Sequence, residues 1–454
     1  MKRLTLALIF VLALTAALFP ALSFGAVADA ATEVLVVYNW EEYISLRGEE
    51  DPDDLEERDL VAGFQRYYKA MTGNSIEVRY TTFDTNETMM ETLRGTIDLI
   101  CPSEYAIQRL KSQDKLMSLT EAQQRSGYTL QNKGNINPVI YDRVEKAGMA
   151  IGDYFVPYMW GTLGIMYNAD VVTEADLEAG YGILWNAAGN PQLNKNIFLK
   201  DSIRDTYVAA VLYLKEQNRL EGTPYEDYTV QELINCTDTT MLSLAENALI
   251  EQKAVNKGYG VDNDKVELMK GTAYVDLAWS GDAVYSIDEA EEGVNLDYFV
   301  PEVGGNIWFD GWAIPKDNAR NLKAALMFID YLCLPVSAVK NMDFIGYTSA
   351  VDASAILADE EAVQLLADYE YDVDEFFADP VRYPDTSSEN LGVMQDFGAR
   401  NSAANAMWEN VKAYGGTPWI LWVVVGVIAI VGLGLGVAFY FAGHYVPRLK
   451  KIKS

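Results

Sequence analysis

Strand-like and helix-like patterns alternate over the first hundred residues. The segment Glu33–Trp40 (EVLVVYNW) is a run of β-branched and apolar residues, which is typical of a buried strand. Residues 59–72 repeat apolar side chains at helical spacing, and Gly73 follows as a stop signal. A second strand (SIEVRYTTF), a helix over 86–94 and a third strand (IDLICPS) come next. This alternation predicts a parallel sheet covered by helices, which is the α/β class.

The same alternation returns in the middle of the chain. Residues 197–217 predict a strand and a helix, and residues 272–290 predict another strand, turn and helix. We expect residues 154–168 (YFVPYMWGTLGIMYN) to cross from one lobe to the other, and residues 296–315 to cross back. No low-complexity linker separates the halves, and the length exceeds that of one domain. The sequence therefore predicts two interleaved lobes, formed by residues 31–150 with 309–348 and by 151–308 with 349–413.

Both ends of the chain are apolar. Residues 1–30 combine two leading basic residues, an apolar run and a small-residue Ala-Asp-Ala motif, which predicts a secretory signal peptide. Residues 419–442 are 24 residues without a charge. As a helix they would be roughly 36 Å long, enough to cross a membrane. The tail, 443–454, is basic and should stay in the cytoplasm. We therefore expect an outward-facing protein anchored to the cell membrane by one C-terminal transmembrane helix, residues 418–442.

The charge of the outward-facing part is strongly negative. Residues 31–417 contain 29 basic and 65 acidic residues, a net charge of −36. This excess argues against a nucleic-acid partner, because such binding depends on neutralising phosphates. It suits a cationic ligand, because a negative field raises the local concentration of cations. Most of these charges serve solubility.

The residues that are missing exclude several kinds of chemistry. The single histidine, His444, follows the predicted span, so the outward-facing part has no histidine for Ser-His-Asp or Cys-His catalysis or for a zinc site. No Gly-rich phosphate loop ending in Gly-Lys-Ser or Gly-Lys-Thr occurs. The acidic run 49–59 lacks the spacing of a calcium loop. The three cysteines are too few for a disulfide framework. We expect no cofactor and no metal.

Aromatic and acidic residues recur together where the predicted strands end. Ligands of parallel sheets bind beyond the carboxyl ends of the strands. The residues found there or in turns are Trp40, Glu41, Glu42, Tyr43, Ser103, Tyr105, Asp205, Trp279, Asp282, Trp308, Asp310 and Tyr347.

This combination suits an alkyl diamine or polyamine. Its methylenes would bury against the rings at roughly 0.8 kcal/mol per CH₂. Its ammonium groups would lie over ring faces, for about 0.5–2 kcal/mol each. Each buried ammonium also needs an anionic partner, because desolvation would otherwise outweigh the gain. A sugar would use the tryptophans too, but would require more amides and mixed donors.

Seven motifs occur in order along most of residues 33–413: YNWEEYI, NETM, PSEY, PYMWGT, WSGDA, GGNIWFDGWAIP and IGYTSAV. Together they resemble the bacterial spermidine/putrescine-binding proteins, the extracytoplasmic receptors of polyamine ABC transporters. This resemblance implies a two-lobed periplasmic-binding-protein fold that closes on its ligand and delivers it to a membrane permease driven by a separate ATPase. It also implies a receptor rather than an enzyme.

The resemblance assigns roles within the constellation. Asp310 resembles the acid that holds a terminal amine, and Asp205 the acid at the other end or at the inner nitrogen. Asp282 resembles an acid that also contacts an amine in some receptors, and Gln395 is a looser match. Ser202 stands where an aspartate is frequent, and Glu41 where a small hydroxyl is usual. Our hypothesis is that Glu41 or Asp282 restores the lost charge, with an altered preference for ligand length.

Two other functions remain open from the sequence. The first is the same fold with another cationic or amino-acid-derived solute. The second is a glycosidase that uses two of these acids, because paired carboxylates carry out that chemistry without histidine.

Overall fold

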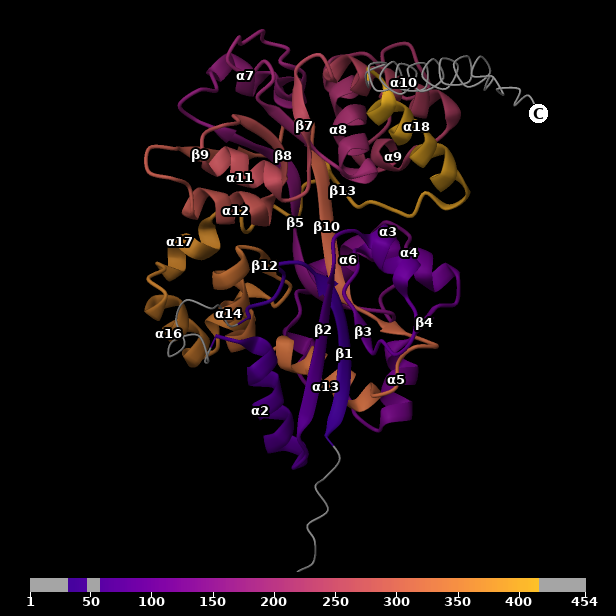
Figure 1. Cartoon of the computed structure of the whole chain (residues 1–454), viewed down its shortest axis with the longest axis vertical. Coiled ribbons are helices and arrows are strands. Elements are labelled where there is room, and N and C mark those ends of the chain that lie inside the picture. The colour runs from indigo at the N-terminus through magenta and orange to yellow at the C-terminus, as the bar shows by residue number, and fades with distance from the viewer. Residues whose placement is uncertain (1–31, 47–57, 416–454) are drawn as a thin grey trace, which may run out of the picture.

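A computed structural model describes residues 32–46 and 58–415, which form two lobes joined by long strands (Figure 1). The predicted signal peptide, most of the acidic run 49–59, the predicted span 418–442 and the tail 443–454 lie outside the described residues. Within the described ranges no single helix is long and apolar enough to cross a membrane; only α13 (Leu322–Leu332) and α14 (Pro335–Ile345), bent by 75°, pass that test as a pair.

The first lobe contains the predicted parallel sheet. Strand β1 (Glu33–Trp40) pairs in parallel with β2 (Ile76–Phe83) on one side and with β3 (Leu99–Ile100) on the other. The third strand is shorter than the sequence pattern indicated. The other elements of the first lobe are α2 (Leu60–Thr72), α3 (Asn86–Thr92), α4 (Glu104–Ser112), β4 (Leu116–Met117), α5 (Leu119–Ser126), α6 (Pro138–Lys146), β11 (Ile314–Pro315), α13, α14 and β12 (Thr348–Ser349).

Helix α2 illustrates how the local sequence determines an element. The Asp59 side chain accepts a hydrogen bond from the amide of Ala62, which satisfies one of the free donors of the first turn. Gly73 ends the helix in the left-handed region, at φ 79°, as glycine favours. Leu60, Phe64 and Tyr68 form the buried face of the helix. The predicted helix and its stop are confirmed.

The second lobe packs helices around further strands of an eight-stranded sheet. The main order is β13 (Leu391–Gly392), β10 (Gly305–Trp312), β5 (Val156–Asn168), β8 (Val275–Trp279), β6 (Ile197–Lys200) and β7 (Asn256–Gly260). Strands β9 (Leu296–Phe299) and β12 also pair with β5. The predicted strand and helix pairs are β6 (Ile197–Lys200) with α8 (Ile203–Glu216) and β8 (Val275–Trp279) with α12 (Ser280–Asp288). The remaining elements are α7 (Glu174–Glu178), α9 (Val230–Asn235), α10 (Thr239–Gln252), β7 (Asn256–Gly260), α11 (Asn263–Met269), β9 (Leu296–Phe299), β13 (Leu391–Gly392) and α18 (Asn401–Ala413).

Two long antiparallel strands run through both lobes, as the vertical ribbons of Figure 1 show. They are β5 (Val156–Asn168) and β10 (Gly305–Trp312), the two segments expected to cross. The first half of β5, up to Trp160, packs in the core of the first lobe, and its second half, from Leu163, packs in the other cores. The lobes are therefore interleaved, and β5 and β10 connect them.

We propose lobe boundaries that follow these cores, and they differ from the sequence prediction in more than one place. Residues 151–160, for instance, were expected in the second lobe, but Ile151, Phe155 and Trp160 pack in the core of the first lobe. Residues 349–378 were expected in the second lobe. Their helices, α15 (Ala353–Leu357), α16 (Glu360–Asp368) and α17 (Val373–Ala378), instead contribute Ile356, Leu366 and Phe376 to the core of the first lobe. Only the segment from Met394 onward, including α18, packs in the second core. Apolar contacts, which the chain order does not reveal, explain the difference.

Candidate functional site

A cleft of about 1260 Å³ lies between the lobes. It is lined by side chains from both, including twelve of the thirteen residues proposed from the sequence. These twelve are Trp40, Glu41, Glu42, Tyr43, Ser103, Tyr105, Asp205, Trp279, Asp282, Trp308, Asp310 and Tyr347. The aromatic and acidic residues that are scattered along the sequence therefore converge in one place.

The turn after β1 supplies one aromatic wall of the cleft. Trp40 ends the strand, and its ring packs against Phe83 with the ring centroids 4.8 Å apart. Tyr43 makes edge-to-face contact with Tyr347 at 5.0 Å, and the ring of Tyr347 also lies 5.7 Å from that of Trp308. These rings form an apolar surface suited to an alkyl chain.

The start of α4 supplies hydroxyl groups. The side-chain amide of Asn86, the first residue of the NETM motif, donates to the Ser103 hydroxyl at 3.0 Å and to the Tyr105 hydroxyl at 2.9 Å. Its carbonyl oxygen accepts from the Ser103 amide. Asn86 is buried and orients both hydroxyls toward the cleft. The sequence analysis did not name Asn86 as a site residue, although the NETM motif contains it.

Asp310 is a buried acid on β10, and no lysine or arginine among the described residues forms an ion pair with it. Its Oδ2 accepts a hydrogen bond from the Tyr43 hydroxyl at 2.8 Å, while its Oδ1 has no hydrogen-bond partner among the described residues. Burial raises the pKa of the Asp310 carboxyl to about 7, against the opposing effects of the Tyr43 hydrogen bond and of the nearby Ser103 side chain. The negative charge of nearby Asp205 also raises this pKa.

Asp205 lies in the first turn of α8, in the second lobe. The indole nitrogen of Trp279 donates to its Oδ1 at 3.2 Å, and burial raises the pKa of its carboxyl. Within residues 32–46 and 58–415, no lysine or arginine forms an ion pair with Asp205 or Asp310. Lys200 and Arg204 act on Asp205 from a distance and oppose the rise of its pKa, so the two acids offer negative charge that is only partly compensated.

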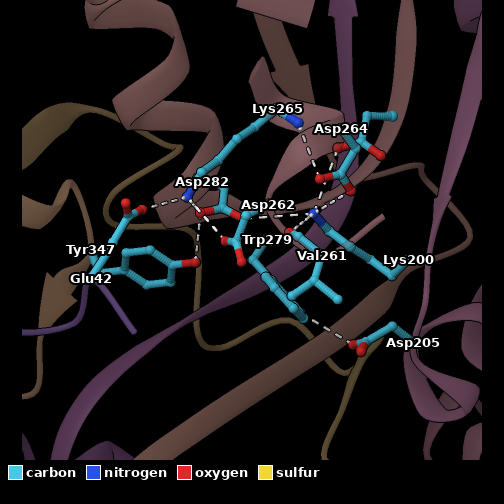
Figure 2. A network of polar contacts seen from close by, with 11 residues as sticks. Glu42, Lys200, Asp205, Val261, Asp262, Asp264, Lys265, Trp279, Asp282 and Tyr347 are labelled. Atoms are coloured by element: carbon cyan, nitrogen blue, oxygen red, sulfur yellow. Dashed lines mark hydrogen bonds and ion pairs between the residues drawn. The ribbon is translucent and has the colours of Figure 1, made fainter. Parts of the chain in front are cut away.

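Asp282 has a different environment from these two acids (Figure 2). Its Oδ1 accepts hydrogen bonds from the Lys265 ammonium at 3.2 Å and from the Tyr347 hydroxyl at 2.9 Å. Lys200 lies 3.6 Å from its Oδ2. Burial alone would raise the pKa of Asp282, but the two lysines outweigh burial and lower it. Asp282 is thus already paired with cations of the protein itself.

Lys200 anchors a buried charge cluster behind the cleft. Its ammonium lies 2.9 Å from Asp264, 3.6 Å from Asp276 and 4.6 Å from the centroid of the Trp279 ring. Burial favours the neutral amine, but the carboxylates outweigh it and raise the pKa of Lys200. The sequence analysis did not foresee this cluster.

The structure places Ser202 and Glu41, the two residues that depart from the motifs of the resembling proteins, at the edges of two elements. Ser202 is the N-cap of α8, and its hydroxyl accepts from the Asp205 amide. Glu41 is exposed in the turn after β1. Glu42 adopts a left-handed backbone, φ 48°, and its carboxylate lies 3.5 Å from the Lys265 ammonium. The hypothesis that Glu41 or Asp282 restores the charge missing at Ser202 stays a prediction; Asp282 already pairs with Lys265.

Gln395 does not line the cleft, in contrast to the expectation. Its side-chain amide donates to the Ala147 carbonyl, and its own carbonyl accepts from Arg204 at 2.7 Å. Arg204 itself does line the cleft, and its guanidinium stacks 3.7 Å from the centroid of the Tyr105 ring. Gln395 thus helps to position Arg204. The spacing around Gln395 matches the family motif only loosely, which already set it apart from the other candidates in the sequence.

Comparison with known proteins agrees with this architecture. Residues 64–367 match the family described as bacterial extracellular solute-binding proteins. The chain is 26% identical over 401 residues to the spermidine/putrescine-binding periplasmic protein of Escherichia coli (strain K12), over 87% of this chain and 96% of that protein. It is 27% identical over 360 residues to the putrescine-binding periplasmic protein PotF of the same organism, over 77% of this chain and 86% of that one.

Two solved structures resemble the fold over nearly their whole length. A putative spermidine/putrescine ABC transporter protein from Listeria monocytogenes superposes with a TM-score of 0.62 at 29% identity, covering 84% of this chain and 100% of that one. The spermidine/putrescine substrate-binding protein PotD from Streptococcus pneumoniae gives 0.59 at 26%, covering 84% and 99%. The resemblance inferred from the motifs is confirmed. The chain belongs to the family of bacterial extracellular solute-binding proteins.

Proposed function

We propose that this protein is a polyamine receptor that binds putrescine or spermidine outside the cytoplasm and delivers it to the permease of an ABC transporter. The observation that carries the proposal is an aromatic cleft that contains two buried acids, Asp205 and Asp310, which form no ion pair within the described part of the chain. The names of the relatives support it, because those proteins are described as binding spermidine and putrescine. Receptors of this kind bind and release solute, so the protein is not a glycosidase.

The proposed ligand contacts follow from chemistry. An ammonium group would donate to the free Oδ1 of Asp310, and a second to Asp205. The methylenes between them would bury against Trp40, Trp308 and the nearby tyrosines. The proposed ligand-binding residues are Trp40, Tyr43, Ser103, Tyr105, Asp205, Trp279, Trp308, Asp310 and Tyr347.

Closure of the lobes would couple binding to delivery. Asp205 and Trp279 belong to the second lobe, whereas Tyr43 and Ser103 belong to the first. A ligand that contacts both groups favours the closed arrangement, because it gains those contacts together only when the lobes meet. The permease would then recognise the closed form.

A second candidate is an amino-acid-derived cation. The observation that favours it is Arg204, which lines the cleft and whose Nε and Nη2 have no hydrogen-bond partner among the described residues. A ligand carboxylate could pair with such a guanidinium. Its ion pair with Asp396, at 3.7 Å, partly compensates that charge, which makes this the weaker proposal.

Isothermal titration calorimetry separates these functions. The purified outer domain is titrated with putrescine, spermidine, a panel of amino acids and short oligosaccharides. We expect saturable binding of one or both polyamines and none of the oligosaccharides. Binding of amino acids alone would favour the second candidate, and no binding of any amine would contradict the receptor proposal.

We also propose that residues 418–442 tether the receptor to the membrane. Their 24-residue uncharged core and the basic tail that follows support a single span with a cytoplasmic end. A tether would raise the concentration of the receptor beside its permease. Deleting residues 418–454 should move the protein from the membrane fraction to the medium or periplasm; retention in the membrane would contradict the tether.

A further inference from the structure

Lys265 occupies a position in the cleft that resembles a bound ammonium group. It extends from α11, and its Nζ lies 3.2 Å from Asp282, 3.3 Å from Asp262 and 3.5 Å from Glu42. The ring of Tyr285 lies 5.8 Å away. Several carboxylates and a ring surround one cation, which is the arrangement that an amine ligand requires.

These contacts come from both lobes. Figure 2 shows Glu42 and Tyr347 reaching Lys265 and Asp282 from one side of the cleft. Asp282 and Lys265 belong to the second lobe, and Glu42 to the first. The lysine therefore bridges the lobes at this end of the cleft.

The two ends of the cleft consequently differ in charge. At one end Asp205 and Asp310 lack ion-pair partners among the described residues, whereas at the other Asp282 contacts Lys265 and lies 3.6 Å from Lys200. Trp279 separates them, with its indole nitrogen on Asp205 and one face toward Lys200. Two ammonium groups thus find free acids, and a third would meet two resident cations.

We propose that Lys265 is a specificity-determining residue that fills the ammonium position beside Asp282, so that the site takes a short diamine in preference to a triamine. This rests on the proposed polyamine function and narrows its ligand class. A triamine that reached Asp282 would have to displace Lys265 or lie beside it, and like charges at such distances repel. The resident lysine also supplies the contact between lobes that a third amine would otherwise make.

The test compares the affinities of putrescine and spermidine by calorimetry in the wild type and in variants. In the wild type we expect putrescine to bind at least tenfold more tightly. Lys265→Ala removes the cation and vacates its position, so the ratio should shift toward spermidine by at least tenfold. Lys265→Arg keeps a charge there and should keep the preference for putrescine.

Lys257→Ala is the matched control. Lys257 lies in the same lobe and pairs with Glu267 at 2.9 Å, outside the cleft lining, so its removal should leave the ratio unchanged. An unchanged ratio in Lys265→Ala, with both polyamines still binding, overturns the role of Lys265 alone. A wild type that prefers spermidine also overturns it, even if the alanine variant fails to fold. Absence of any polyamine binding overturns the proposed function as well.

Discussion

The indole nitrogen of Trp279 donates a hydrogen bond to Asp205 at 3.2 Å, while the ammonium of Lys200 lies 4.6 Å from the centroid of the same indole. One ring thus contacts a free acid of the cleft and a buried cation behind it. This arrangement fixes the ring and stabilises the Asp205 carboxylate without neutralising it, because the indole carries no net charge. The Asp205 carboxylate is therefore held in a fixed orientation in which it can bind a cationic ligand.

Removing the charge of Asp310 should weaken diamine binding. In Asp310→Asn the ammonium would lose its anionic partner but keep a carbonyl oxygen of similar shape. We expect a loss of about 3 kcal/mol, or roughly 100-fold in affinity, measured by calorimetry at pH 8. Asp142→Asn, an exposed change on α6, is the control. Equal affinities of the two variants would contradict the role given to Asp310.

Diamine affinity should depend on pH near neutrality. Because the pKa of Asp310 is about 7 in the free protein, about half of these groups carry a proton at pH 7. The ligand requires the ionised form, so affinity should fall about tenfold between pH 8 and pH 6 and level off at higher pH. Calorimetry at pH 7 should detect proton release on binding. Constant affinity over this range would refute the assignment.

The Asp310 carboxyl should also make the stability of the unliganded protein depend on pH. This stability should fall as the pH rises, whereas diamine affinity should increase. The pKa of this carboxyl is raised from an ordinary value of 3.8, so the folded state holds a proton that the unfolded chain releases. Its contribution is complete below about pH 4 and is lost as the pH rises to about 7. Urea unfolding of the wild type and Asp310→Asn should therefore differ in pH dependence across this window, the variant showing the smaller loss as pH rises.

Gly281 permits the close approach of the two lobes. A Cβ built on this residue of α12 would collide with the ring of Tyr347, which belongs to the other lobe. Gly281→Ala should therefore hinder closure and lower ligand affinity at least tenfold, although alanine favours the helix itself by up to about 1 kcal/mol. Small-angle scattering with ligand should show a larger radius of gyration than for the wild type. A variant that closes and binds normally would show that this contact does not limit closure.

The buried lysine behind the cleft should be important for stability. Lys200→Met would leave Asp264, Asp276 and Asp282 without the cation that they share, which typically costs about 3–5 kcal/mol. Lys257→Met, which breaks a partly exposed pair, should cost less than about 1 kcal/mol. Urea unfolding at pH 7.5 measures both. A similar small cost for the two variants would mean that the cluster is not a major source of stability.

Much of the fold could be predicted from the sequence because its central elements have strong local patterns. β1, α2, β5 and β10 are long or regularly patterned, and each forms where the pattern indicates. The placement of α15–α17 could not be predicted, because it depends on which core accepts Ile356 and Leu366. Such contacts between distant segments leave no periodic signal.

The residues of the candidate site were likewise predictable only in part. Aromatic residues paired with acids were recognisable, and twelve of the proposed residues converge in the cleft. Lys265 was missed because its segment, DNDKVE, has the composition of a solvated helix start, and only tertiary packing brings it against Asp282 and Glu42. The sequence indicates which acids exist, but not which of them the protein neutralises itself.

The most direct test is an experimental structure of the outer domain with putrescine. The account predicts one amine nitrogen within hydrogen-bond distance of Asp310 and the other beside Asp205, with the methylenes against the rings of Trp40 and Trp308. A ligand seated elsewhere, with its amines away from both acids, would contradict it.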